Sequence, residues 1–115
     1  MIEIVVKIYK DASGNVPYLK WFRAIQDPQT RMRIQQRIRR LGKGNFGNCK
    51  NLKDGINELK LDFGPGYRVY YGLEGNTLVI LLYAGNKSSQ TAGVEKAKKY
   101  WRSYKERENN GISKF

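Results

Sequence analysis

The stretch Asn57-Glu-Leu-Lys-Leu-Asp-Phe-Gly-Pro-Gly-Tyr-Arg-Val-Tyr-Tyr71 decides the fold of this chain. Leu59 and Leu61 alternate with charged residues, which is the period of a β-strand with one buried face. Gly64-Pro-Gly66 predicts a tight turn, and the residues after it continue in a second strand-like segment. The two segments are therefore expected to pair as neighbouring antiparallel strands.

The flanking sequence supplies helices and further strands around this pair. Asp27-Pro28 predicts a helix start, because Asp caps free backbone N–H groups and Pro tolerates the first helical position. The short link before it predicts an antiparallel hairpin with the preceding helix. The predicted elements are a strand at 2–9, helices at 18–25 and 28–41, strands at 57–63, 67–73 and 77–84, and a helix at 91–107.

This order, β-α-α-β-β-β-α, predicts a single α+β domain over residues 1–108, followed by a flexible tail at 109–115. A length of 115 residues suits one hydrophobic core rather than two. The apolar run at 78–84 is expected at the centre of a small, mainly antiparallel sheet, because both of its faces need burial. The helical hairpin is expected to cover one face of that sheet.

The charge balance predicts a polyanionic partner. The chain has 22 Lys+Arg against 10 Asp+Glu, a net charge of +12, and no histidine. Nucleic acid is the first candidate for such a partner. With Cys49 as the single cysteine and no histidine, a disulfide, a Cys–His zinc site, a Cys–His nucleophile and a Ser–His–Asp triad are all excluded. No metal, cofactor or membrane contact is expected, and the absence of a signal-like or membrane-spanning run predicts a cytoplasmic protein.

A second set of basic residues lies on the predicted helix at 28–41 and in the segment after it. The helix has several arginines and no acid, whereas a solvated face usually interleaves acids with bases. These side chains are expected to grip RNA or an acidic partner; the alternative is a solvated face whose arginine stems cover the core edge. The candidate binding residues are Arg33, Arg37, Arg40, Lys43, Lys50 and Lys53.

The paired strands place a candidate site on the sheet. Alternation puts Arg68 and Tyr70 on one face. Because the neighbouring leucines need the helix-packed core, Glu58 and Lys60 are expected to share the other, open face with them. Lys87, just beyond the central strand, is expected to close the same concavity. Such a set offers cations for a phosphate, a ring for a base and groups for proton transfer; a surface cross-strand ion-pair patch is the equally weighted alternative.

The stretch at 57–71 closely resembles the hallmark of phage-type addiction module killer proteins, the HigB-like branch of the RelE/ParE toxins. Supporting segments are Gly44-Asn-Phe-Gly-Asn48, Ala84-Gly-Asn-Lys-Ser-Ser-Gln90 and Glu95-Lys-Ala-Lys-Lys-Tyr-Trp101. The resemblance spans nearly the whole chain. It implies a RelE-like fold, with an RNA-facing concavity on the sheet opposite the helical hairpin.

What the resemblance implies for function is a type II toxin that cleaves mRNA on the ribosome without a metal and so inhibits translation. Arg68 matches the arginine thought to stabilise the phosphate, Lys60 a lysine of the same site, and Lys87 a basic residue after the central strand. Glu58 departs from the pattern, since many nucleolytic relatives have a lysine there that acts as base; either Glu58 takes that role or the mechanism differs. The implied partners are the ribosome, mRNA and a cognate antitoxin, expected to be a small helix-turn-helix protein.

Two other functions stay open at this stage. A ParE-like inhibitor of DNA gyrase would share the fold and act without catalysis, although such relatives usually lack the full basic set. A nucleic-acid-binding module with neither activity would show the same salt-dependent RNA affinity as the nuclease. Cleavage during translation separates the nuclease from both alternatives.

Overall fold

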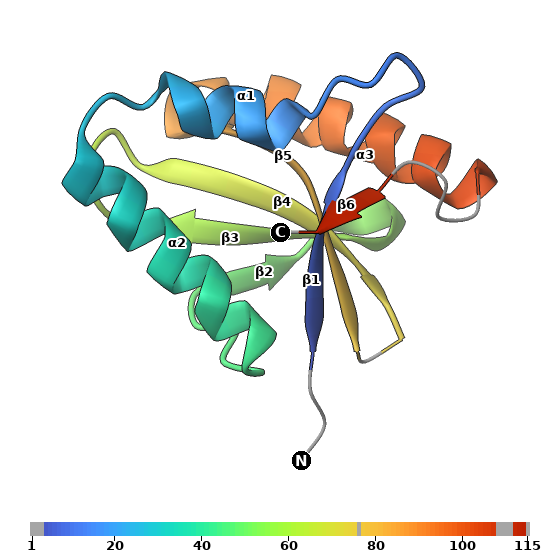
Figure 1. Ribbon diagram of the computed structural model, residues 1–115, viewed down its shortest axis with the longest axis horizontal. Coiled ribbons are helices and arrows are strands. Elements are labelled where there is room, and N and C mark those ends of the chain that lie inside the picture. The colour runs from blue at the N-terminus through green and yellow to red at the C-terminus, as the bar shows by residue number, and fades with distance from the viewer. Residues whose placement is uncertain (1–3, 76, 108–111, 115) are drawn as a thin grey trace.

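A mixed β-sheet forms the centre of the computed structural model, which describes residues 4–75, 77–107 and 112–114 (Figure 1). Within these ranges the sheet has six strands, in the order β2-β3-β4-β5-β1-β6. Nowhere in them is a helix long and apolar enough to cross a membrane. The elements are β1 (Val5–Tyr9), α1 (Pro17–Ala24), α2 (Pro28–Gly42), β2 (Cys49–Asn51), the 3-10 turn η1 (Lys53–Gly55), β3 (Ile56–Leu61), β4 (Tyr67–Glu74), β5 (Leu78–Asn86), the 3-10 turn η2 (Lys87–Ser89), α3 (Gln90–Glu106) and β6 (Ile112–Lys114).

The strand pairing confirms the predicted α+β class and the mainly antiparallel sheet. β1 and β5 are parallel, and the other neighbouring strands are antiparallel. The structure adds two short edge strands to the predicted order. β2 forms between the helix predicted at 28–41 and the strand predicted at 57–63, where no element was predicted, and β6 forms in the tail that was expected to be flexible, where it pairs with β1. The other residues of that tail, 109–111 and 115, lie outside the described residues.

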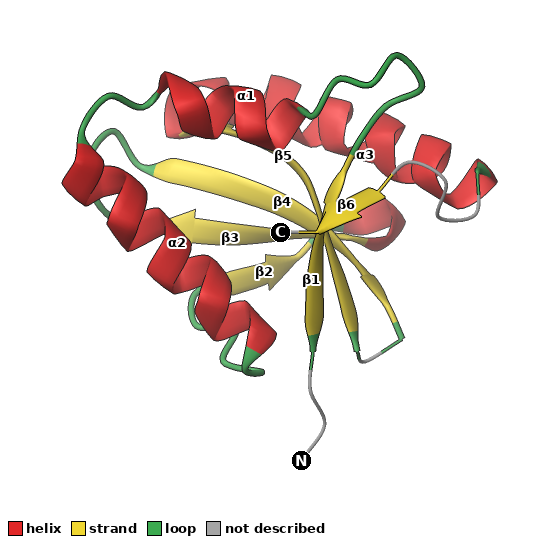
Figure 2. Ribbon diagram, in the orientation of Figure 1, coloured by secondary structure: helices red, strands yellow, loops and turns green. Residues whose placement is uncertain are grey.

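The sheet is covered by helices on both faces, so that the described residues form two apolar cores (Figure 2). The expectation of a single core is therefore wrong. On one face Ile34 and Ile38 of α2 pack with Leu59 and Leu61 of β3. On the other face α3 supplies the buried side chains Ala97, Trp101 and Tyr104. β5 contributes buried side chains to both cores, which confirms its predicted central position.

The corner between α1 and α2 differs from the predicted antiparallel hairpin. Figure 1 shows α2 turning away from α1 instead of lying along it, so that prediction is wrong. Each helix presents its own apolar stripe to the sheet, and two helices that both follow the sheet do not need to pack on each other. Arg31 fixes the corner, because its Nη1 donates hydrogen bonds to the carbonyl oxygens of Ile25 at 2.6 Å and Gln26 at 3.4 Å.

A bulge in β5 changes which way its side chains point. The register with β4 shifts between Tyr70 and Tyr71, so Leu82 is an extra residue of β5. Alternation therefore breaks at this point: Leu82 and the following Tyr83 both face the α3 side, and Ala84 returns to the α2 side. Bulges commonly re-aim a side chain in this way.

The predicted cap of α2 is confirmed and yields a pH-dependent expectation. Asp27 accepts hydrogen bonds from the backbone N–H of Gln29 at 3.2 Å and from the hydroxyl of Thr30 at 2.7 Å. These bonds, first that of Thr30, lower the pKa of Asp27. The cap therefore stabilises the fold at pH values above the ordinary carboxyl pKa, and this stabilisation is lost as the pH falls through the lowered pKa of Asp27.

We expect Asp27→Ala to lower the melting temperature at neutral pH, and the difference in melting temperature from wild type to shrink in acid. A difference that does not change with pH would contradict a charged cap.

Candidate functional site

The residues predicted for the sheet site lie together on β3 and β4. Glu58 pairs with Tyr70, and Lys60 pairs with Arg68, across the two strands. Directly opposed residues of an antiparallel pair project from the same face. The structure therefore brings these four side chains to one face, as the alternation predicted.

Lys87 reaches the same place from the turn between β5 and α3. Its backbone N–H donates a hydrogen bond to the carbonyl oxygen of Gly66 at 2.7 Å. A β-carbon at Gly66 would lie 3.4 Å from Cβ of Lys87 and 3.7 Å from Nη1 of Arg68, so these two cations flank one glycine. Gly66 has a φ of +78°, which a side chain would strain. The group is termed the sheet cluster below; its members are Glu58, Lys60, Arg68, Tyr70 and Lys87.

The face that carries the sheet cluster is covered rather than open, which corrects the expectation of an exposed concavity. Glu58 is 0% exposed, Tyr70 1% and Arg68 6%. The first turns of α3 form the cover: Gln90 Nε2 donates to Glu58 Oε2 at 2.7 Å, and the Tyr70 hydroxyl donates to the Gln90 carbonyl oxygen at 3.4 Å. Gly93 allows this approach, since a β-carbon there would lie 2.9 Å from the Tyr70 ring. Lys60 is half-buried and Lys87 exposed, so these two lysines are accessible.

A buried ion pair lies inside the cluster. Arg68 Nε is 3.9 Å from Glu58 Oε1, and the two side chains are 8% and 0% exposed. Arg68 also donates from Nη1 to the carbonyl oxygen of Tyr67 at 3.1 Å. The guanidinium is thus held by one hydrogen bond and faces a carboxylate 3.9 Å away, and this carboxylate balances only one of the three cations. The cluster keeps a net positive charge, which suits an anion.

The surroundings of Tyr70 determine which proton transfer its hydroxyl can perform. Burial, and then the carboxylate of Glu58, raise the pKa of Tyr70 far above its ordinary value. The hydroxyl therefore stays protonated at neutral pH and can donate a hydrogen bond, but it is no general base. Glu58 is also unsuited to direct contact with a substrate, because it is buried and already bound to Gln90.

The arginines predicted to bind a partner on α2 divide between structure and surface. Arg33 lies 4.0 Å above the ring of Phe63 in a cation–π contact and is also exposed. Arg37 packs its guanidinium where a side chain at Gly47 would otherwise lie. Arg40 at the end of α2 and Lys43 just after it are exposed and available to a partner.

The lysines of the following segment lie elsewhere. Lys50 on β2 is opposite Glu58, which places it on the face of the sheet cluster rather than with the helical arginines. Lys53 is exposed in η1. The six predicted binding residues thus occupy more than one surface.

Sequence reasoning missed Gln90 and Gly93, the residues that close α3 over the cluster. The sequence offered only a weak signal for them, a small residue and an amide at the start of an amphipathic helix.

Among the described residues no group of three or more Cys, Asp or Glu side chains could hold a metal ion. Burial raises the pKa of the Cys49 thiol, which donates a hydrogen bond to the Phe46 carbonyl oxygen at 2.7 Å, so this thiol is a poor nucleophile.

These features define a small, strongly basic α+β domain with a cation cluster at one end of its sheet. No protein-family model matches the sequence. A protein of Haemophilus influenzae (strain ATCC 51907 / DSM 11121 / KW20 / Rd), named "Uncharacterized protein", is 44% identical over 78 residues, which cover 68% of this chain and 79% of that protein. The chain belongs to the same family as this Haemophilus protein.

Proposed function

We propose that this protein is the toxin of a type II toxin–antitoxin system, a ribosome-dependent mRNA endoribonuclease that inhibits translation. The observation that carries the proposal is the convergence of Lys60, Arg68 and Lys87 at one end of the sheet, with Arg68 held by a buried carboxylate. The resemblance of residues 57–71 to the hallmark of HigB-like toxins supports it. In this proposal a cognate antitoxin covers the exposed basic surface until the toxin is released.

The proposed chemistry uses the RNA as its own nucleophile. A base removes the proton of the 2′-hydroxyl, whose oxygen attacks the adjacent phosphorus. The bond to the 5′ oxygen breaks, and an acid protonates that oxygen, which leaves a 2′,3′-cyclic phosphate and a 5′-hydroxyl. The accessible Lys60 and Lys87 stabilise the charge that develops on the phosphate oxygens, and the buried Arg68 adds positive potential from within the cluster.

The burial of the cluster assigns different roles to its members. Lys60 and Lys87 are the accessible groups of the cluster, so the proton transfers fall to them in this proposal. Glu58 is a positioning residue that orients Arg68, and Tyr70 supports the cluster as a hydrogen-bond donor. This assignment replaces the sequence-based expectation that Glu58 or Tyr70 acts directly on the RNA.

Alanine variants of the accessible lysines test this proposal. We expect Lys87→Ala and Lys60→Ala each to reduce mRNA cleavage by about 100- to 1000-fold, the usual cost of losing one transition-state donor. The measurement maps mRNA 5′ ends after induced expression and follows growth in parallel. Lys99→Ala is the matched control, because Lys99 is an exposed lysine of α3 outside the cluster. Cleavage by both cluster variants at the wild-type rate would refute the proposed site.

A gyrase inhibitor is the second candidate, and the cover over the cluster is the observation that favours it. Glu58 and Tyr70 are buried under α3, while Arg40 and Lys43 offer an exposed basic surface to a protein partner. A supercoiling assay with purified protein separates the candidates. Dose-dependent loss of gyrase activity with intact mRNA would favour the inhibitor.

A further inference from the structure

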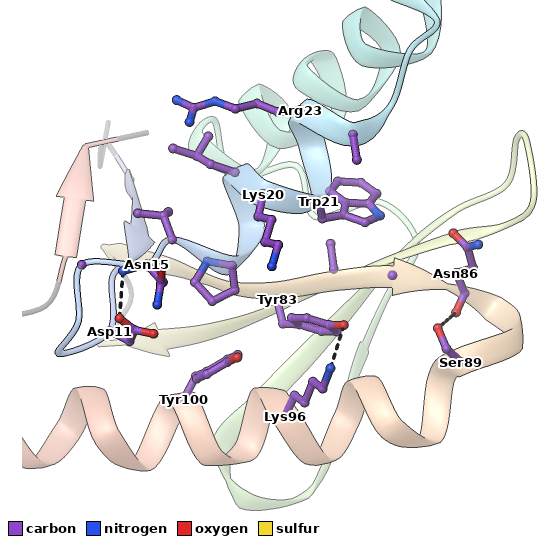
Figure 3. A pocket seen from close by; sticks show the side chains of 17 residues that line it. Asp11, Asn15, Lys20, Trp21, Arg23, Tyr83, Asn86, Ser89, Lys96 and Tyr100 are labelled. Carbon is purple, nitrogen blue, oxygen red and sulfur yellow. Dashed lines mark hydrogen bonds between the residues drawn. The ribbon is translucent and has the colours of Figure 1, made fainter.

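The second half of β5 borders a cleft that the proposed site does not use. β1 pairs with β5 only over Leu78–Leu81, so beyond that point β5 has β4 on one side and no described strand on the other. α1 and α3 flank this open edge, and the cleft between them measures about 1090 Å³ (Figure 3). Small-ligand pockets are typically about 300–1000 Å³. The cleft is therefore large enough for part of a polymer.

The walls of the cleft combine aromatic rings. Figure 3 shows Tyr83 on β5, with Trp21 on α1 to one side and Tyr100 on α3 to the other. The ring centroids of Tyr83 and Tyr100 are 6.2 Å apart. All three residues are half-buried and line the cleft. Tyr83 faces this side of the sheet because of the bulge at Leu82.

The same walls are positively charged. Lys20 and Arg23 of α1 and Lys96 of α3 line the cleft and are exposed. Lys96 Nζ lies 5.1 Å from the ring centroid of Tyr83 and 3.4 Å from its hydroxyl, so a cation accompanies the ring (Figure 3). Asp11 is the one acid among the lining residues, and its carboxylate already accepts hydrogen bonds from the N–H groups of Ser13 and Asn15.

This pattern of rings and cations favours single-stranded RNA as the occupant. Unpaired bases stack on aromatic side chains, whereas the bases of a duplex are stacked on one another and cannot. The cations match the phosphates, and the amide side chains of Asn15 and Asn86 in the wall can bond to base edges. A peptide added as a strand along the open edge of β5 would bond to the backbone groups of that edge. Unless it were acidic, however, it would have no negative charges to match the cations of the cleft.

One end of the cleft is formed by chain and strand neighbours of the sheet cluster. Asn86 and Ser89 line its end and stand on either side of Lys87 in the chain. Arg68 pairs with Gly85, another lining residue. We propose that the cleft between α1 and α3 binds the single-stranded RNA that flanks the phosphate held by the sheet cluster. That the bound RNA lies beside a phosphate to be cleaved rests on the proposed function. That the cleft binds single-stranded RNA does not depend on the nuclease activity.

Equilibrium binding to a non-cleavable RNA tests the cleft apart from catalysis. The probe is a fluorescent single-stranded RNA of about eight nucleotides, a length within the usual range of such sites, with every 2′-hydroxyl methylated. We expect Tyr83→Ala to weaken binding by about tenfold or more, because the variant has no ring on which a base can stack. Tyr83→Phe keeps the ring and should bind nearly as wild type does.

The charge variants keep the test valid if Tyr83→Ala fails to fold. Lys20→Ala and Lys96→Ala change exposed side chains, and each should weaken binding and reduce the slope of log affinity against log salt by about 0.7. Lys99→Ala, on the same helix but outside the cleft, should match wild type. Wild-type affinity in Lys20→Ala and Lys96→Ala would overturn the inference.

The outcomes also separate this inference from the proposed function. RNA binding that depends on Tyr83 and Lys96, together with no cleavage in cells, would support the cleft and defeat the nuclease. Cleavage lost in Lys87→Ala, together with RNA binding unaffected by the cleft variants, would support the nuclease and defeat the cleft. Binding of a poly-glutamate peptide at the cleft in place of the RNA would assign it to an acidic polypeptide and overturn the RNA proposal.

Discussion

Purified Arg68→Ala protein is expected to unfold with a free energy about 3–5 kcal/mol below that of wild type, the usual cost of removing one partner of a buried ion pair. Glu58 is 0% exposed, and Gln90 bonds only one of its carboxylate oxygens. Without the guanidinium, the other oxygen would stay buried and would lose the cation that faces it at 3.9 Å. Because small domains have about 5–15 kcal/mol in total, the loss should be plain in urea-induced unfolding.

A double variant separates the stability of this pair from its role in cleavage. Replacing both partners, as in Arg68→Met with Glu58→Leu, removes the buried charge together with its counterion, and such replacements are often neutral or stabilising. The double variant should therefore be more stable than Arg68→Ala and should still fail to cleave mRNA. Equal stability of Arg68→Ala and wild type would show that the Glu58 carboxylate does not depend on Arg68.

The grouping of the sheet cluster was predictable, whereas its cover was not. Period-two alternation is local, so the side-chain faces of Glu58, Lys60, Arg68 and Tyr70 followed from the sequence. The identity of the covering element is a tertiary property. The part of the sheet that α3 closes depends on its contacts with distant residues, those of Gly93 with the ring of Tyr70, of Gln90 with Glu58 and of Trp101 with Gly72.

The missed edge strands and the cleft share a physical reason. β2 and β6 are three residues each and lack the alternating apolar pattern of a half-buried strand, so their extended conformation comes from pairing with β3 and β1. The cleft exists because β5 extends beyond the end of its pairing with β1, and because the bulge at Leu82 turns Tyr83 toward the α3 side. Neither a difference in strand length nor a bulge follows from the composition of one segment.

The second large effect is expected at Gly72 in the middle of β4. The indole of Trp101 on α3 lies directly on this residue, in the space that a β-carbon would occupy. Both residues are buried, and the overlap is with a rigid ring rather than with the end of a flexible chain. Gly72→Ala should therefore cost about 3 kcal/mol of unfolding free energy, at the upper end of the usual overpacking range.

Two further variants attribute this loss to the contact with Trp101. Gly42→Ala is the control, because a β-carbon there would lie 3.4 Å from Val6 in ordinary contact, and its effect should stay within about 0.5 kcal/mol. Trp101→Leu opens the space over β4, so Gly72→Ala should cost less in that background, with a coupling of roughly 0.5–3 kcal/mol. If the losses of unfolding free energy from Gly72→Ala and Trp101→Leu simply add, the cost of the methyl group comes from the strand and not from the indole. A measured coupling would show that α3 is held on the sheet by the contact of Trp101 with Gly72. The same helix covers the sheet cluster through Gln90 and Gly93.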